Sequence, residues 1–195
     1  MSPARTYGDG CGIAHALDLI GERWALLVVR ELFLGPLRFS ELRAGLPGAS
    51  PTLLAQRLRD LERSGVVARR RLPPPAAASL YELTRHGAEL EPILIALGSW
   101  GLRSRLSPAG PVSPTSAMLT LRTYHRPAPD WPGTVEVRLG DRRYLVSADG
   151  DAFVVTTGDP PPGTPTVTSD PGGLLDLLGD EPIVQAATLR ATPQN

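Results

Sequence analysis

The first half of the chain shows apolar residues at the spacing of helices. They recur at helical intervals over residues 11–20, cover nearly every side of residues 22–34, and form one stripe along residues 51–64. These patterns predict a short amphipathic helix, a central buried helix and a helix with one apolar face. A further short helix is predicted at 39–44, and a tight Gly/Pro turn separates it from the helix at 51–64. Two helices around such a turn are typical of a helix-turn-helix.

The residues that follow change to the pattern of a hairpin. A β-branched and basic run at 66–71 predicts a strand, the Pro/Ala segment at 73–78 predicts a loop, and residues 80–83 predict the returning strand. Thr84 then caps a last helix with a long apolar stripe. Pro92 marks an early kink in that helix. The order of four helices, hairpin and helix predicts a winged helix-turn-helix.

The second half has the two-residue alternation of strands. Val135, Val137 and Leu139 share one face of a strand at 134–139, and two more strands are expected at 142–147 and 152–157. Gly-Asp pairs at the joints favour an antiparallel β-meander. A further strand at 164–169 and a short helix at 172–178 complete the pattern. The fold class is therefore α+β, with a winged-helix domain at 1–106, a Pro-rich linker at 107–116 and a small α+β domain at 117–195.

One face of the predicted helix at 51–64 carries donors suited to DNA. Thr52, Gln56, Arg59 and Arg63 fall within one arc of about 60° at helical spacing, and Leu54, Leu58 and Leu61 lie opposite. Ser50 followed by Pro51 is a typical helix start. A glutamine amide pairs with adenine, and arginines pair with guanine or phosphate. The candidate DNA-binding residues are Ser50, Thr52, Gln56, Arg57, Arg59, Arg63, Arg69, Arg70 and Arg71. A solvated helix face is the alternative interpretation.

Two of these assignments leave alternatives open. Arg57 lies between the polar and apolar faces, so it contacts a phosphate or pairs with Asp60 or Glu62. Residues 69–71 alternate along a strand, so at least one arginine is expected to point outward, toward the DNA backbone or minor groove. The alternative is that this run of cations is only solvated.

Charge supports placing DNA binding in the first half. Residues 1–106 hold fourteen arginines and ten acidic residues, a net charge of +4, whereas residues 107–195 have a net charge of −4. A single cysteine excludes an internal disulfide framework. No leader and no apolar run of about 18 residues is present, so we expect a cytoplasmic chain with no membrane partner. No catalytic, metal-binding or cofactor motif is visible, and we expect neither an enzyme nor a cofactor.

Three segments resemble the HxlR family of bacterial winged-helix transcription regulators, which is close to the MarR family. They are CGIAHALDLIGERWALLVVREL from Cys11 to Leu32, RFSELRAGLPGASPTLLAQRLRDLERSGVVAR from Arg38 to Arg69, and YELTRHGAEL with LGSWG between Tyr81 and Gly101. The resemblance implies a homodimer, joined by the first and last helices, that binds a pseudo-palindromic operator in double-stranded DNA. The function indicated is that of a repressor. The expected interface residues are Ile13, Leu17, Leu90, Ile93, Leu94, Leu97 and Trp100.

Cys11 is the candidate sensor of oxidants or electrophiles. It lies at a helix start, where amide dipoles favour the thiolate. The family resemblance places it where redox-sensing members carry their reactive cysteine. The alternative is a small buried apolar residue, which is the commonest role of a free cysteine.

The second half resembles the sterol-carrier-protein type of domain. The similar residues are the strands from Val135 to Thr157 and TVTSDPGGLLDLLGDEP from Thr166 to Pro182. The resemblance implies an apolar small-molecule effector, or a domain that only packs. The alternative function is an apolar-ligand carrier or sequestering protein with a vestigial DNA-binding module.

Overall fold

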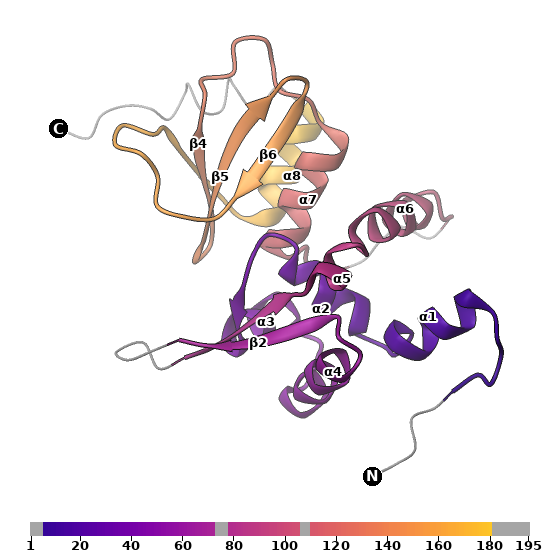
Figure 1. Ribbon diagram of the computed structural model, residues 1–195. Helices are drawn as coiled ribbons and strands as arrows, with labels where there is room; N and C mark the ends of the chain where they lie inside the picture. The colour runs from indigo at the N-terminus through magenta and orange to yellow at the C-terminus, as the bar shows by residue number, and fades with distance from the viewer. Residues whose placement is uncertain (1–5, 73–77, 106–109, 181–195) are drawn as a thin grey trace. The chain divides into compact units, whose positions relative to one another are not determined.

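The computed structural model describes residues 6–72, 78–105 and 110–180, and it divides the chain into two compact units. The first unit spans Met1–Arg105 and the second spans Leu106–Asn195. Figure 1 shows the elements of each unit. Most of the loop predicted at 73–78, part of the predicted linker and the residues after 180 lie outside the described ranges.

The first unit has the predicted order of helices and strands. Its helices are α1 (Gly12–Ile20), α2 (Ala25–Leu32), α3 (Phe39–Gly45), α4 (Pro51–Arg63), α5 (Arg85–Ala88) and α6 (Glu91–Leu102). Its strands are β1 (Leu37–Arg38), β2 (Val67–Arg71) and β3 (Ser79–Leu83), which form an antiparallel sheet in the order β1-β3-β2. The helices predicted at 11–20, 39–44 and 51–64 and both wing strands are confirmed. The two-residue strand β1 was not predicted, because so short a segment has no readable period.

Two helices differ from the prediction, each for a local reason. Helix α2 begins at Ala25 rather than Glu22, since Trp24 has a φ of 78°. Its indole lies so close to Gly48 that a Cβ there would be 2.8 Å from the ring. The single helix expected after Thr84 is two helices, α5 and α6. Pro92 lies in the first turn of α6 and has no amide to donate to the preceding turn, so the helix is interrupted.

The core of the first unit forms around α2. Val28 and Val29 are fully buried, which confirms the predicted central helix. Leu54, Leu58 and Leu61 of α4 are also buried, at 1% exposed or less, and belong to the same cluster. Burying a leucine or valine side chain stabilises a fold by about 1.5–3 kcal/mol. The apolar face of α4 is therefore held against the core, and its orientation is set.

A clamp around Thr84 joins the end of α4 to α5. The Thr84 hydroxyl donates to the Gly65 carbonyl at 2.6 Å and accepts from the Gly87 amide at 3.0 Å. Gly65 has a φ of 71° where the chain leaves α4, a conformation that favours glycine. A Cβ at Gly87 would overlap the Val66 carbonyl oxygen. The clamp therefore requires glycine at position 87.

The second unit is a four-stranded sheet with helices against it (Figure 1). Its elements are α7 (Pro114–Tyr124), β4 (Val135–Leu139), β5 (Arg142–Asp149), β6 (Ala152–Thr156), β7 (Thr166–Ser169) and α8 (Pro171–Asp180). The sheet order is β6-β5-β4-β7. Strands β4, β5 and β6 form the predicted antiparallel meander, and β7 pairs with β4 in parallel. Helix α7 was not predicted, and its first residues fall within the predicted linker at 107–116.

The strand β4 shows how the second unit forms its core. Val135, Val137 and Leu139 are buried, as their alternation predicted. Glu136 is buried as well, because Arg138 donates to its carboxylate at 2.8 Å and Thr166 at 2.9 Å. These hydrogen bonds, the Arg138 bond above all, hold the pKa of the Glu136 carboxyl below its usual value. The acid therefore remains ionised inside the unit.

The Thr84 clamp gives the first testable prediction. Gly87→Ala is expected to lower the free energy of unfolding by about 2–3 kcal/mol, because the added methyl group has no room. Gly12→Ala is the matched control, since a Cβ at Gly12 meets nothing within 4 Å. Urea denaturation of both variants measures the difference. Equal unfolding midpoints would contradict the close approach of Gly87 to Val66.

Candidate nucleic-acid interface

Helix α4 is the element that presents the candidate DNA-reading residues. Ser50 has an extended backbone, and its hydroxyl accepts a hydrogen bond from the Leu53 amide at 3.3 Å. Pro51 occupies the first turn, where no amide is needed. The predicted start of the helix at Ser50-Pro51 is therefore confirmed. The cap fixes the first turn, on which Thr52 lies.

The polar arc of α4 faces away from the core. Thr52, Arg59 and Arg63 are exposed and Gln56 is half-buried, while the leucines opposite are buried. One helix face is thus available to a partner.

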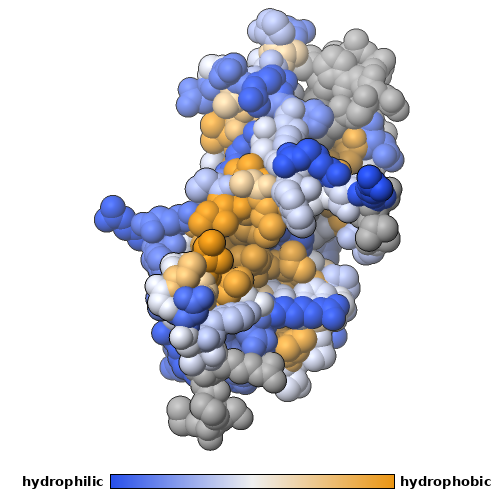
Figure 2. Space-filling view, turned by 90° about the vertical axis from the view of Figure 1, so that its right-hand side faces the viewer, coloured by the Kyte–Doolittle hydropathy of each residue, from blue (hydrophilic) through white to orange (hydrophobic). Residues whose placement is uncertain are grey.

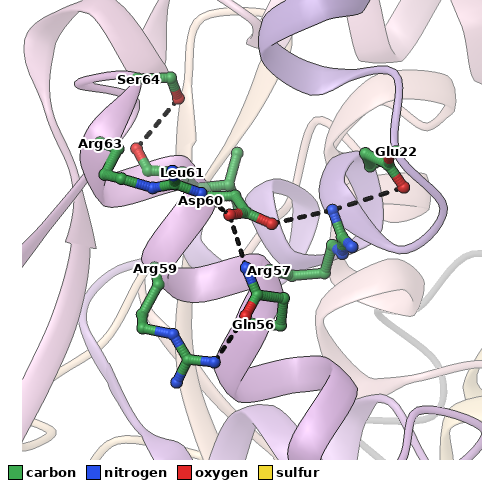
Figure 3. Close-up of polar contacts among 8 residues, drawn as sticks. All are labelled: Glu22, Gln56, Arg57, Arg59, Asp60, Leu61, Arg63 and Ser64. Atoms are coloured by element: carbon green, nitrogen blue, oxygen red, sulfur yellow. Dashed lines mark hydrogen bonds and ion pairs between the residues drawn. The ribbon is translucent and has the colours of Figure 1, made fainter. Parts of the chain in front are cut away.

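The polar side chains on this face form one connected network (Figure 3). Arg59 Nη2 donates to Gln56 Oε1 at 2.6 Å, and Gln56 Nε2 donates to Asp60 Oδ1 at 2.8 Å. Arg63 forms an ion pair with the same carboxylate. Asp60 was expected only as a candidate partner of Arg57 and not as the centre of this network. Its spacing of three and four residues from Arg63 and Gln56 was the available signal, since such pairs meet on a helix.

Arg57 was expected either to contact a phosphate or to pair with a carboxylate, and it pairs with a carboxylate. Its Nη1 lies 3.0 Å from Asp60 Oδ2 and 3.5 Å from Glu22 Oε2, and 12% of its side chain is exposed. Asp60 was an expected partner, whereas Glu22 takes the place expected for Glu62. The ion pair leaves little of Arg57 for a phosphate. Arg57 therefore connects α4 to the segment between α1 and α2.

The wing exposes three arginines in different settings. Arg69 donates to the Ser79 hydroxyl at 3.0 Å, and its guanidinium lies 5.7 Å from the centre of the Tyr81 ring. Arg70 pairs with Glu82 at 3.3 Å. Arg71 is exposed and has no ion pair or hydrogen bond within the described part of the chain. All three lie on β2, on the strand that leads to the tip of the wing.

Cys11 is exposed and precedes the first residue of α1. The alternative that it is a buried apolar residue is therefore wrong. The backbone amides of Ala14 and Ile13 lower the pKa of the Cys11 thiol from its ordinary value, although the thiol does not complete a capping hydrogen bond. Its own amide donates to Asp9 at 2.9 Å. Exposure and a favoured thiolate are the conditions for reactivity.

Apolar side chains are exposed on α1 and α6. Within α6 no residue is buried. Of the seven expected interface residues, Leu90 and Leu94 pack partly on the unit's own core. The remaining five expose between 43% and 73% of their area: Ile13, Leu17, Ile93, Leu97 and Trp100. Figure 2, which views the side that carries α1 and α6, shows hydrophobic side chains gathered in one area.

Two other kinds of site, a metal cluster and a membrane span, are absent from the described ranges. No group of three or more His, Cys, Asp or Glu side chains there could hold a metal ion. None of the helices in those ranges is both long enough and apolar enough to cross a membrane.

Known proteins that match about half of this chain are helix-turn-helix transcriptional regulators. The model of the HxlR-like helix-turn-helix family matches residues 19–107. An uncharacterized HTH-type transcriptional regulator of Synechocystis is 40% identical over 99 residues, which is 51% of this chain and 73% of that protein. The HTH-type transcriptional regulator YodB of Bacillus subtilis is 35% identical over 85 residues, which is 44% of this chain and 76% of that protein.

Solved structures match a similar share of the chain. The reduced form of YodB is 34% identical, with a TM-score of 0.43, and the match covers 47% of this chain and 90% of that one. The redox regulator HypR in its oxidized form is 32% identical, with a TM-score of 0.47, and the match covers 50% of this chain and 100% of that one. A further structure of YodB is described as quinone-bound.

The cap of α4 gives the second testable prediction. Ser50→Ala removes the acceptor of the Leu53 amide and is expected to lower the free energy of unfolding by about 1 kcal/mol. Thr52→Ala, two residues along the same exposed turn, is the control and should change it by less than about 0.5 kcal/mol. Thermal or urea unfolding distinguishes the two. A larger loss for Thr52→Ala than for Ser50→Ala would contradict the assigned cap.

Proposed function

The chain belongs to the HxlR-like helix-turn-helix family of transcriptional regulators, and from this premise we propose that it is a homodimeric repressor of a pseudo-palindromic operator. It is a regulator and not an enzyme. The observation that carries the proposal is the polar face of α4, exposed opposite three buried leucines and followed by a basic wing. Such a repressor acts in the cytoplasm, where bacterial DNA lies.

In the proposed complex, α4 of each subunit enters the major groove. Two half-sites one helical turn apart are separated by about 34 Å. Gln56 pairs with an adenine, and Arg59 and Arg63 contact guanine or phosphate. Thr52 and Ser50, at the start of the helix, contact the backbone. Arg57 has its guanidinium in an ion pair and supports the helix instead.

The wing supplies contacts to the phosphates. Arg71 has no partner among the described residues and is the first candidate. Arg69 and Arg70 are exposed, and each has a neutral or acidic neighbour that holds it in place. Cations on β2 add affinity that does not depend on sequence. The net charge of +4 on residues 1–106 supports this arrangement.

The third prediction tests the reading helix. Duplexes are first selected from a random library by the unmodified chain, and affinity for the selected duplex is then compared with affinity for its scrambled version. Gln56→Ala and Arg59→Ala are each expected to weaken binding to the selected duplex by about 1–3 kcal/mol at fixed salt. Arg85→Ala, which removes an exposed cation on α5, is the control. Recovery of no preferred sequence would overturn the proposed function.

The exposed apolar residues of α1 and α6 support a two-fold dimer. Ile93, Leu97 and Trp100 lie at helical spacing on α6, and Ile13 and Leu17 do so on α1. Exposed patches of this kind mark interaction surfaces. A symmetric interface would place two α4 helices at a fixed separation. The dimer thus supports recognition of two half-sites.

The fourth prediction concerns this interface. Ile93→Glu and Leu97→Glu are expected to give monomers at micromolar concentration, because a carboxylate would be buried without a partner. Analytical ultracentrifugation measures the mass. Val154→Glu is the control, since Val154 is an exposed apolar residue of β6 in the other unit. A monomeric unmodified chain would contradict the dimer.

Cys11 is the proposed sensor of electrophiles. The Cys11 thiolate would add to a ring C=C bond of a quinone, forming a C–S bond while the π electrons move to the quinone oxygen, which takes up a proton from water. The adduct would lie at the start of α1, beside the proposed dimer interface. A bulky group there would change the relative placement of the two α4 helices and release the DNA. The exposure and the lowered pKa of Cys11 support the proposal, and the 35%-identical relative YodB has a structure described as quinone-bound.

The fifth prediction follows the pH dependence of this thiol. A lowered pKa means that the Cys11 thiol is half ionised at a lower pH than the thiol of a cysteine in an unfolded peptide. Alkylation of Cys11, the only cysteine in the sequence, should therefore reach its half-maximal rate at a lower pH than alkylation of such a peptide. Benzoquinone should release the selected duplex from the unmodified chain and leave Cys11→Ser bound. Release of both proteins alike would exclude Cys11 as the sensor.

The second unit is proposed to be a sterol-carrier-protein-like input domain for an apolar effector. Its helices and sheet support that architecture, and Met118, Leu121 and Tyr144 are fully buried in its core. The rival function is a carrier with a vestigial DNA-binding module. A fluorescent fatty acid distinguishes them: a carrier binds it without sequence-selective DNA binding, whereas a regulator binds DNA selectively and the ligand changes that affinity.

A further inference from the structure

We propose that Asp60 is a positioning residue that sets the sequence selectivity of α4. The inference rests on the proposed function, because it concerns how the reading face of α4 recognises DNA. Asp60 does not belong to the set of direct DNA contacts. It acts by holding Gln56, Arg57 and Arg63, which surround it (Figure 3).

The carboxylate of Asp60 accepts from three side chains of the same helix. Gln56 Nε2 donates to Oδ1 at 2.8 Å, and Arg63 forms an ion pair with the same oxygen. Arg57 Nη1 lies 3.0 Å from the other oxygen, Oδ2. The Asp60 side chain is 24% exposed. An isolated surface ion pair contributes little to stability. Three donors on one half-buried carboxylate form a network, and a network restricts the rotamers of all its members.

The network fixes the orientation of the Gln56 amide. The Arg59 guanidinium has only donors, so its partner on Gln56 must be the amide oxygen. The Asp60 carboxylate has only acceptors, so its partner must be the amide nitrogen. Both neighbours therefore require the same orientation. One amide hydrogen and one oxygen lone pair remain unused on Gln56. A base that offers one acceptor and one donor, as adenine does in the major groove, matches what remains.

Asp60 is itself held from outside the helix. Arg57 connects it to Glu22, which precedes α2, through the contact of 3.5 Å between Arg57 Nη1 and Glu22 Oε2. Arg57 is 12% exposed, so its position is restricted by packing as well as by charge. The reading side chains are thus ordered before DNA arrives. A protein that orders such side chains in advance loses less conformational entropy on binding.

The negative charge of Asp60 also raises selectivity, because it weakens non-selective binding. A carboxylate on the DNA-facing helix repels phosphates and occupies Arg63, which weakens binding to any sequence. Loss of this charge would free a cation for the backbone and strengthen non-selective binding, with a steeper salt dependence. The positional effect and the charge effect are separable, because a glutamate keeps the charge while moving the oxygens by one methylene.

The experiment measures the ratio of affinities for the selected duplex and its scrambled version at several salt concentrations. Asp60→Asn and Asp60→Glu are each expected to lower this ratio roughly tenfold, the scale of losing one base contact. Asp60→Asn should also steepen the salt dependence, and Asp60→Glu should leave it unchanged. In a Gln56→Ala background, Asp60→Glu should change the ratio no further, since Asp60 acts through Gln56. Glu89→Gln removes one exposed carboxylate just after α5 and is the charge control.

Three results would overturn the inference. A ratio unchanged in Asp60→Glu would reduce the role of Asp60 to its charge. An equal loss in the presence and absence of Gln56 would show that Asp60 does not act through the amide. A lowered ratio that follows a lowered unfolding midpoint would assign Asp60 a role in stability alone. If the unmodified chain has no sequence preference, the proposed function fails together with the inference. In the other three cases the unmodified chain still prefers one sequence, and only the inference fails.

Discussion

The packing of α4 on α2 sets what the N-terminal unit presents outward. Leu54, Leu58 and Leu61 are buried in the cluster that contains Val28 and Val29 of α2. A helix has 3.6 residues per turn, so burying one face of α4 turns the residues on the opposite face away from the core. The polar arc of α4 therefore follows from the leucines. Replacing one of them by alanine would cost about 2–5 kcal/mol and loosen the reading face with it.

The remaining elements of the first unit hold this arrangement from both ends. The Ser50 cap fixes the first turn of α4, and the Thr84 clamp fixes the chain beyond its last turn. Strand β3 pairs with both β1 and β2, so the arginines of the wing are tied to the body of the unit. These contacts are short polar interactions around one apolar core. A reading face needs this rigidity, because base contacts depend on placement.

The same unit packs its outermost helices, α1 and α6, only partly against its own core. Helix α6 has no buried residue, and α1 buries only Ala14. By contrast, the second unit buries four of the five residues of β4: three apolar residues and Glu136, which accepts hydrogen bonds from Arg138 and Thr166. The first unit therefore offers an apolar surface for a partner subunit.

The sequence by itself determined the elements that depend on local order. Helix α4, its start at Ser50, its leucine face and its polar arc follow from periodicity and capping within fourteen residues. Contacts between distant residues decided the rest. Only the tertiary structure shows that Trp24 turns against Gly48, that β7 pairs in parallel with β4, and that Arg57 reaches Glu22. Such contacts depend on which surfaces meet after the helices pack, and no period along the chain encodes that meeting.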